Sequence, residues 1–201
     1  MVHNLTMIPG DWIGPEMAEA VQQIISAAGV SIVWDVQPCG LSTWESERAL
    51  IPERVYDSIR RNKIALKSPV ATPAGAKIAN PTAELRKSLD LYCNIRPMRN
   101  IWGLPCKYPD LDIVIIREAT EDVYAGIEHQ VVPGVVETLK VTTARACERI
   151  SRAAFEYARM RGRKKVTTVH KANIMKLADG LFLDVSRRVA SEYPDLSLIH
   201  I

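Results

Sequence analysis

The sequence predicts an α/β protein in which strands and helices alternate. Short apolar runs such as LDIVII (111–116) and VTTV (166–169) have the length and β-branched content of buried strands. Longer segments, for example 174–192, repeat apolar residues every three or four positions, which is the period of a helix with one buried face. This alternation is typical of a sheet covered by helices.

Taken in order, the amino-terminal half predicts three strands and two helices. The first helix begins at Pro15 and Glu16, because proline and acidic residues favour a first helical turn, and it ends at Gly29. The other elements expected in this half are strands in LTMIP (5–9), SIVWDV (31–36) and KIAL (63–66) and a helix in PERVYDSIRRN (52–62).

The second half continues the pattern. After the strand LDIVII we expect a helix over 143–161, the strand VTTV, a helix over 174–192 and a final apolar strand in SLIHI (197–201). The helix over 174–192 is expected to bury one face, which consists of Ile174, Leu177, Ala178, Leu181, Phe182, Val185 and Val189.

Composition narrows the class of protein. A chain of 201 residues, 47% hydrophobic, can form one large or two small domains with a real core. It has neither 18 consecutive apolar residues nor a signal peptide pattern, so we expect a soluble, cytoplasmic protein that binds no membrane. Its four cysteines lack a CxxC spacing and are expected to be reduced core thiols. The basic cluster RMRGRKK (159–165) predicts a solvated helix end rather than a nucleic-acid site.

Cations follow three of the expected strands. Lys67, Arg117 and Lys171 stand at or just after the carboxyl ends of these strands, where open α/β sheets bind ligands. Arg86 and Arg96 join Arg117 among apolar neighbours. A guanidinium meets a carboxylate with two parallel hydrogen bonds, so the three arginines indicate a small substrate with two or three carboxylates.

A structural role is the alternative for these arginines. Glu84, Asp90 and Glu118 lie close to them in sequence and could pair with them inside the protein. Spacing alone favours this alternative, because buried arginines usually have a protein partner.

Five segments together resemble one family of enzymes. They are IPGDWIGPE (8–16), KSPVATP (67–73), LRKSLDLYCNIRP (85–97), DIVIIREATEDVYAGIEH (112–129) and HKANIMKLADGLF (170–182). In this order and spacing they resemble the isocitrate and isopropylmalate dehydrogenases, which are metal-dependent β-decarboxylating dehydrogenases. The resemblance implies two α/β domains around a cleft without a GxGxxG motif, with residues 1–97 in the large domain and 98–201 in the small dimerisation domain.

The resemblance also implies roles for particular residues. The family oxidises a 3-substituted malate at carbon 2 and then releases carbon dioxide from the resulting β-keto acid. By position, Tyr124 matches the tyrosine that protonates the enol, and Lys171 matches the lysine that helps to remove the hydroxyl proton. Without the resemblance, Tyr124 would be taken for an ordinary core tyrosine. The residues that match the substrate site are Thr72, Asn80, Thr82, Arg86, Arg96 and Arg117, and Asn173 matches a cofactor contact.

The substrate is expected to be isocitrate. Asn80 and Thr82 stand where isocitrate enzymes of the family carry a serine and an asparagine, and both can donate hydrogen bonds to a third carboxylate. Homoisocitrate is the second choice and 3-isopropylmalate the third, since neither residue offers an apolar surface for an isopropyl group. Trp12, Ser68 and Cys93 depart from the family, which has glycine, glycine and alanine there.

Cofactors and partners follow from the same resemblance. The family uses NAD or NADP with Mg²⁺ or Mn²⁺, and its metal-binding aspartates and adenine loop lie beyond the position of residue 201. We therefore expect residues 1–201 to be an incomplete, inactive portion of an NAD-dependent enzyme, with NADP possible and no metal ligand of its own. A homodimer with shared sites is expected, in which the clasp-like segment 125–142 meets the partner. A heteromeric assembly, with this chain as a noncatalytic regulatory subunit, is the alternative.

Overall fold

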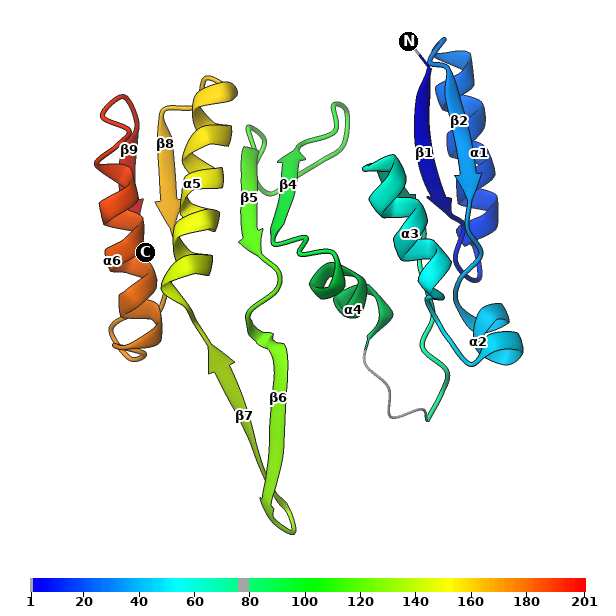
Figure 1. Cartoon of the computed structure of the whole chain (residues 1–201). Helices are drawn as coiled ribbons and strands as arrows, with labels where there is room; N and C mark the ends of the chain where they lie inside the picture. Colours follow the sequence, from blue (N-terminus) through cyan, green and yellow to red (C-terminus); the bar gives the residue numbers. More distant parts are fainter. Residues whose placement is uncertain (1, 76–79) are drawn as a thin grey trace. The chain divides into compact units, whose positions relative to one another are not determined.

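A computed structural model describes residues 2–75 and 80–201 and divides the chain into two compact units, residues 1–89 and 90–201 (Figure 1). The domain boundary expected after residue 97 falls inside strand β4 (Cys93–Arg99). Because β4 pairs along its whole length with β5 (Asp112–Glu118), it stays with the second unit. Each unit is α/β, as the sequence predicts.

Residues 1–89 form a three-stranded parallel sheet with helices. Its strands have the order β2-β1-β3, and Met7 of β1 lies between Val36 and Leu66 of its two neighbours. The elements are β1 (His3–Ile8), α1 (Gly14–Ala27), β2 (Ile32–Val36), α2 (Leu41–Glu47), α3 (Glu53–Asn62), β3 (Ala65–Lys67) and α4 (Pro81–Ser88). The three strands and helices α1 and α3 confirm the predictions, whereas the short helices α2 and α4 were not predicted.

The core of this unit lies between the sheet and α3. Ile8, Cys39 and Val55 are almost fully buried and form one cluster. Thr6 of β1, the strand that also carries Ile8, is fully buried, and its hydroxyl is hydrogen-bonded to the hydroxyl of Ser58 of α3 at 2.6 Å. A buried hydroxyl with a partner avoids the cost of desolvation, so the pair fixes α3 against β1.

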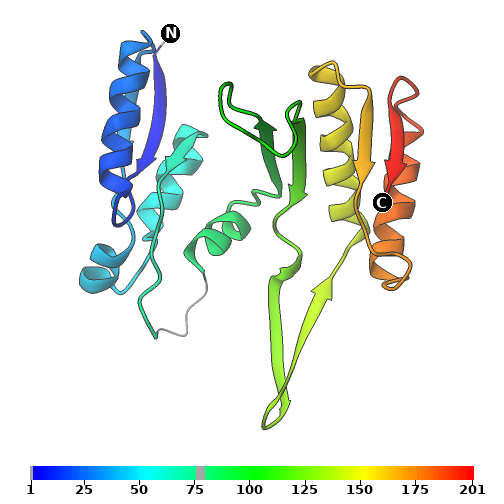
Figure 2. The ribbon, with the colours of Figure 1, turned by 180° about the vertical axis from the view of Figure 1, so that it is seen from behind.

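Residues 90–201 contain three pairs of strands and two long helices (Figures 1 and 2). The elements after β5 are β6 (Asp122–Val132), β7 (Val135–Val141), α5 (Ala144–Met160), β8 (Lys165–Thr168), α6 (Ala178–Ala190) and β9 (Ser197–His200). Strands β4 and β5 are antiparallel, and β8 and β9 are parallel. Strands β6 and β7 form an antiparallel hairpin that includes most of the clasp-like segment 125–142.

Helices α5 and α6 pack against each other and carry the core of this unit. Phe155 is 1% exposed, and its ring stacks on that of Tyr193 with centroids 5.0 Å apart. Val185 and Val189 of α6 join the same cluster. The helix predicted from residue 174 begins only at Ala178, and Leu177 before it is 90% exposed, so the first apolar positions of that pattern are not buried.

The four cysteines are free thiols, as predicted. Cys39 and Cys147 are buried, Cys93 is half-buried, and Cys106 is exposed in the loop between β4 and β5, so the expectation that all four lie in the core was wrong. None of the helices in 2–75 and 80–201 is both long enough and apolar enough to cross a membrane.

The loop after β1 contains two residues with a positive φ, and only the second of them, Trp12, is strained by it. Gly10 has φ of +66°, and a Cβ there would lie 2.0 Å from the carbonyl oxygen of Pro69, so only glycine fits. Two positions later Trp12 also adopts a positive φ, 56°, with 72% of the residue exposed. This is the position where the sequence resemblance expects glycine.

Replacing Trp12 by glycine should stabilise the protein. A left-handed backbone costs a non-glycine residue about 1–2 kcal/mol, and the greater freedom of glycine in the unfolded chain returns part of this gain. We expect Trp12→Gly to raise the free energy of unfolding by about 0.5–1 kcal/mol, measured by urea denaturation. Trp12→Ala removes the same indole but keeps the strain, so an equal gain in that variant would contradict this account.

Candidate functional site

In residues 1–89, Asp11 organises the loops that follow β1 and β3. Its carboxylate accepts hydrogen bonds from the N–H of Leu41 at 2.9 Å and from the N–H of Ala71 at 2.7 Å. Its own N–H donates to the carbonyl of Pro69 at 2.8 Å. These bonds fix the segment that leads to Thr72, which is exposed. Sequence reasoning missed Asp11; the acidic residue beside Gly10 in the first loop was the available signal.

Helix α4 carries three of the predicted substrate residues. The Asn80 side chain caps this helix by accepting hydrogen bonds from the N–H groups of Thr82 and Ala83 at 3.0 and 3.1 Å. Thr82 and Arg86 are four residues apart and therefore share one face of the helix. The Asn80 carbonyl oxygen is occupied by the cap, which leaves its NH₂ group to donate to a ligand; residues 76–79 ahead of it lie outside the described residues.

Lys67 and Arg86 bring positive charge to this unit. The Lys67 side chain is half-buried, and its Nζ donates to the carbonyl of Ser68 at 2.9 Å. Burial lowers the pKa of Lys67, and the charge of Arg86 lowers it further. Because the positive charges of Lys67 and Arg86 repel each other, a bound anion would stabilise the charged form of Lys67.

In residues 90–201, the paired strands β4 and β5 assemble a second group of polar residues. Asn94 lies directly opposite Arg117 in the antiparallel register, so the two side chains share one face. Arg96, two residues along β4, donates from its Nε to the Asn94 side-chain oxygen at 2.9 Å. The Arg117 guanidinium lies over the ring of Tyr124, 4.8 Å from its centroid. The structure thus brings together Arg96, Arg117 and Tyr124 and adds Asn94.

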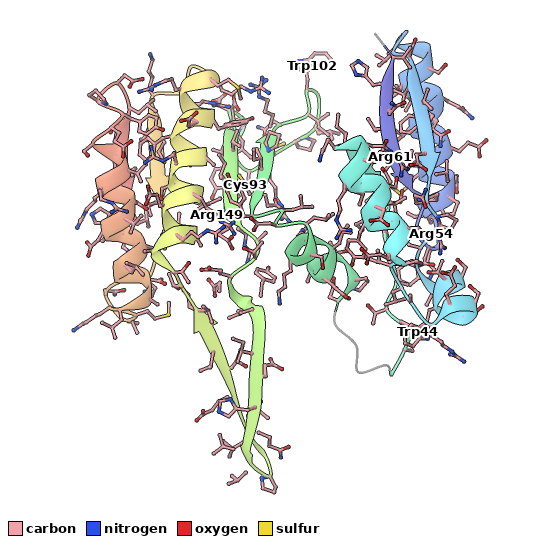
Figure 3. All side chains as sticks on the ribbon, viewed as in Figure 1. Trp44, Arg54, Arg61, Cys93, Trp102 and Arg149 are labelled. Carbon is pink, nitrogen blue, oxygen red and sulfur yellow. The ribbon has the colours of Figure 1, made fainter. Side chains whose placement is uncertain are left out.

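The structural ion pairs considered above do not form. Asp90 and Glu118 both bind Arg149 of α5, which is labelled in Figure 3. The NH1 group of Arg149 lies 2.8 and 2.9 Å from the two Asp90 oxygens, and its NH2 group lies 3.1 Å from Glu118. Within 2–75 and 80–201, neither Arg96 nor Arg117 has an ion pair. Their charges therefore remain available to a ligand.

Arg149 is itself tightly held. Its guanidinium stacks on the ring of Tyr92 at 4.4 Å from the centroid and also donates to the Thr120 hydroxyl at 2.7 Å. Burial raises the pKa of Glu118, but hydrogen bonds from Thr120, from the N–H of Glu121 and from Arg149 outweigh it and hold that pKa below its ordinary value. The Glu118 carboxylate is therefore kept charged, with Arg149 as its ion-pair partner.

Lys171 lies on the turn between β8 and α6. Its N–H donates to one oxygen of the buried Asp179 at 2.6 Å, and Lys140 at the end of β7 binds the other oxygen at 2.5 Å. Asp179 therefore fixes the backbone of this turn, whereas the Lys171 side chain is exposed. Asn173 is exposed as well and has no hydrogen-bond partner among the described residues.

A cavity of about 1000 Å³ opens within residues 90–201. Arg117, Tyr124, Lys140 and Asp179 line it where β5 and β8 end. The rest of its lining comes from β5, β8 and one face of α5. No three His, Cys, Asp or Glu side chains in the described parts of the chain are grouped so that they could hold a metal ion.

Comparison with known proteins identifies the family. The model of the isocitrate/isopropylmalate dehydrogenase family matches residues 4–201, and the chain belongs to this family. It is 48% identical over 193 residues to the mitochondrial NAD isocitrate dehydrogenase regulatory subunit 1 of Arabidopsis thaliana, covering 96% of this chain and 51% of that protein. It is 45% identical to the chloroplastic 3-isopropylmalate dehydrogenase of Solanum tuberosum, with 95% and 54% covered.

Solved structures confirm the fold. The crystal structure of isocitrate dehydrogenase from Methylococcus capsulatus matches with a TM-score of 0.93 and 43% identity, covering 99% of this chain and 60% of that one. The chain spans about half the length of the relatives it matches.

The expectation of a cytoplasmic protein was wrong, because the matching NAD isocitrate dehydrogenase subunits are mitochondrial proteins.

Removing Arg149 should destabilise the protein in a pH-dependent way. Arg149→Met leaves Glu118 and Asp90 without their partner, which should cost about 2 kcal/mol at neutral pH. The pKa of Glu118 in the folded protein lies below its ordinary value of 4.5, so the stability that this group contributes is present above that value and is lost as the pH falls. The difference between Arg149→Met and the parent should therefore shrink in urea titrations below about pH 4.5.

The exposed Arg145 on the same helix supplies the control. Arg145→Met should change the free energy of unfolding by less than about 0.5 kcal/mol at any pH. A penalty for Arg149→Met that stays constant from neutral to acid pH would mean that the ion pairs do not carry it.

Proposed function

We propose that this chain forms part of an NAD-dependent isocitrate dehydrogenase, which converts isocitrate to 2-oxoglutarate and carbon dioxide. The observation that carries the proposal is the pair Arg96 and Arg117, which have no acidic partner in the described structure although Asp90 and Glu118 are near them in sequence. Two unpaired guanidinium groups suit a substrate with several carboxylates. The family match supports a 3-substituted malate as that substrate.

Each residue has a role that its chemistry supports. Arg86, Arg96 and Arg117 bind carboxylates and favour the negative charge that develops on oxygen during decarboxylation. Lys171 takes part in removing the proton from the hydroxyl group on carbon 2. Tyr124 gives its phenolic proton to the enol at carbon 3 after carbon dioxide leaves, and the adjacent Arg117 stabilises the phenolate that remains.

The third carboxylate of isocitrate is the ligand that we propose for α4. Thr82 and the NH₂ group of Asn80, which the helix cap does not use, can donate to it, and Thr72 lies on the loop that Asp11 fixes in the same unit. Homoisocitrate carries the same three charges. The potato relative is a 3-isopropylmalate dehydrogenase, but an isopropyl group would leave the Asn80 and Thr82 donors without a partner.

A regulatory subunit is the second candidate. The Arabidopsis relative at 48% identity is a regulatory subunit, and the cap made by Asn80 gives that residue a structural role that does not require a substrate. The arginines together with Tyr124 and Lys171 favour the catalytic role, because a chain without catalysis has no need of the phenol beside Arg117.

The relatives' names support NAD as the cofactor. When bound, it accepts the hydride from carbon 2, and Asn173 beside Lys171 is the residue of this chain that could contact it. The family resemblance also implies Mg²⁺ or Mn²⁺. The described residues do not supply a ligand set for such an ion, so none of the steps above depends on it.

We further propose that two protomers share their active sites. The hairpin of β6 and β7 exposes four valines, Val131, Val132, Val135 and Val136, each about half-exposed or more. An apolar hairpin of this kind suits pairing with a symmetry mate. Lys171 of one protomer would then serve Arg96, Arg117 and Tyr124 of the other.

The Tyr124 phenol tests the proposed reaction. In a full-length polypeptide that carries residues 1–201, Tyr124→Phe should lower kcat for isocitrate by about 10²-fold or more and change KM little. The ring that lies under Arg117 remains, whereas the proton donor is lost. Tyr92→Phe is the matched control, since Tyr92 lies under Arg149 in the same way, and its kcat should stay within about twofold. Equal kcat in parent and Tyr124→Phe would exclude the phenol as the acid.

Mixing two inactive variants tests the shared site. Lys171→Met and Arg117→Ala should each be inactive, but their mixture should regain activity, because one of the two sites in a hybrid dimer keeps both Lys171 and Arg117. Random exchange should restore about a quarter of the parent activity, measured as NADH formation after subunit exchange. If exchange is verified by differently tagged chains and the activity stays at the level of the separate variants, each site is built within one chain.

A further inference from the structure

We propose that His170 is a positioning residue, which holds the turn that carries Lys171 by accepting a backbone hydrogen bond through its Nδ1 atom. This role rests on the function proposed above, because it is the chemistry of Lys171 that makes the shape of the turn matter. His170 contacts neither substrate nor cofactor in this account. It acts on the reaction only through the backbone of the residues that follow it.

The peptide group between Lys171 and Ala172 is bonded on both of its sides. The N–H of Ala172 donates to Nδ1 of His170 at 3.1 Å. The carbonyl of Lys171 accepts from the N–H groups of Ile174 at 3.0 Å and Met175 at 2.9 Å. A planar peptide group whose donor and acceptor are both engaged cannot rotate without breaking a hydrogen bond, so the orientation of this plane is fixed.

The peptide group before Lys171 is held as well. The N–H of Lys171 donates to Asp179 at 2.6 Å, and the other oxygen of Asp179 binds Lys140 at 2.5 Å. The Cα atom of Lys171 lies between these two peptide planes, so together they set its φ and ψ. They therefore also set the direction in which its Cα–Cβ bond leaves the backbone. Because the Lys171 side chain is exposed, the backbone decides where that side chain starts.

The imidazole of His170 takes the place of an asparagine acceptor. Its Nδ1 atom lies as many bonds from Cα as the side-chain oxygen of an asparagine, a residue that commonly accepts a hydrogen bond from the N–H two positions later. To accept the N–H of Ala172, Nδ1 must carry no proton, so the ring is neutral with its proton on Nε2. His170 thus closes a turn of the asparagine type with a ring.

Packing alone does not account for an imidazole here. Its Nε2 atom is buried and has no hydrogen-bond partner within 2–75 and 80–201. An unpaired buried donor costs free energy, which the apolar ring of a phenylalanine would avoid. The ring of His170 stacks on that of His200 with centroids 5.4 Å apart, and a phenylalanine can make the same kind of contact. What the imidazole adds to a plain ring is the acceptor at Nδ1.

Two substitutions separate the acceptor from the ring. His170→Asn keeps an acceptor at the same distance from Cα and removes the ring, whereas His170→Phe keeps a ring and removes the acceptor. In a full-length polypeptide that carries residues 1–201, the amide of Ala172 should exchange with solvent about tenfold or more faster in His170→Phe than in the parent. In His170→Asn its exchange rate should stay within about threefold of the parent.

The same two variants should differ in catalysis. We expect His170→Phe to lower kcat for isocitrate by about tenfold or more, because a misplaced reacting group loses rate steeply. KM should stay within about threefold, since Arg96 and Arg117 are untouched, and His170→Asn should keep kcat within about threefold of the parent. The values are compared per folded enzyme, because lower stability alone leaves kcat of the folded molecules unchanged. If His170→Phe does not fold, His170→Asn decides alone, and its loss of kcat would count against the acceptor.

Three results would overturn the role of His170. They are a kcat that falls as far in His170→Asn as in His170→Phe, an Ala172 amide that stays protected in His170→Phe, and faster exchange in His170→Phe with unchanged kcat. Lys171→Met, measured beside them, separates this failure from that of the proposed reaction. If Lys171→Met is inactive while His170→Phe keeps its kcat, the role of Lys171 stands and that of His170 falls. If Lys171→Met keeps its kcat, both roles fall.

Discussion

The contact of Arg149 with Asp90 and Glu118 is the interaction on which the arrangement of residues 90–201 depends. It ties α5 to Asp90, three residues ahead of the first residue of β4, and to Glu118 at the end of β5, next to Arg117. It also occupies the two carboxylates nearest in sequence to Arg96 and Arg117. Because Arg149 binds both carboxylates, Arg96 and Arg117 have no ion pair within the described residues. The positive charge of these two arginines is therefore not neutralised by an acidic side chain within the described residues.

The elements that could be predicted from the sequence are those in which a helical repeat of apolar residues continues over many positions, or in which apolar residues form a dense run. LDIVII and VTTV were recognisable by their dense apolar and β-branched residues, and the helix of 17 residues at Ala144–Met160 by the apolar positions that recur on its buried face. Helix α2 has only seven residues and α4 eight, and both are largely polar, so neither shows a helical period. The start of α6 was misplaced because Asp179 holds the backbone of Lys171 in a turn, and a side-chain contact of this kind leaves no trace in the apolar pattern.

The sequence supplied candidate residues for the site, which stay a prediction, but it did not show how their side chains are arranged. The resemblance to the family supplied Arg117 and Tyr124, whereas their stacking and the place of Asn94 follow from a register that no local pattern encodes. The choice between substrate binding and internal ion pairs rested on Arg149, which lies 59 residues from Asp90 in the chain. Sequence neighbours suggested the wrong partners because long-range packing decides which charges meet.

The bonds that Asp179 makes with Lys140 and with the N–H of Lys171 have a mechanical consequence. Lys140 closes the strand that returns from the exposed tip of the hairpin, and Lys171 lies on the turn before α6. Lys140 and Lys171 are 31 residues apart in sequence, yet both are bonded to the carboxylate of Asp179. A force applied to the hairpin is therefore transmitted to the backbone of the lysine turn through two short bonds, without passing through α5. A movement of the β6–β7 hairpin and a movement of the turn that carries Lys171 are therefore coupled.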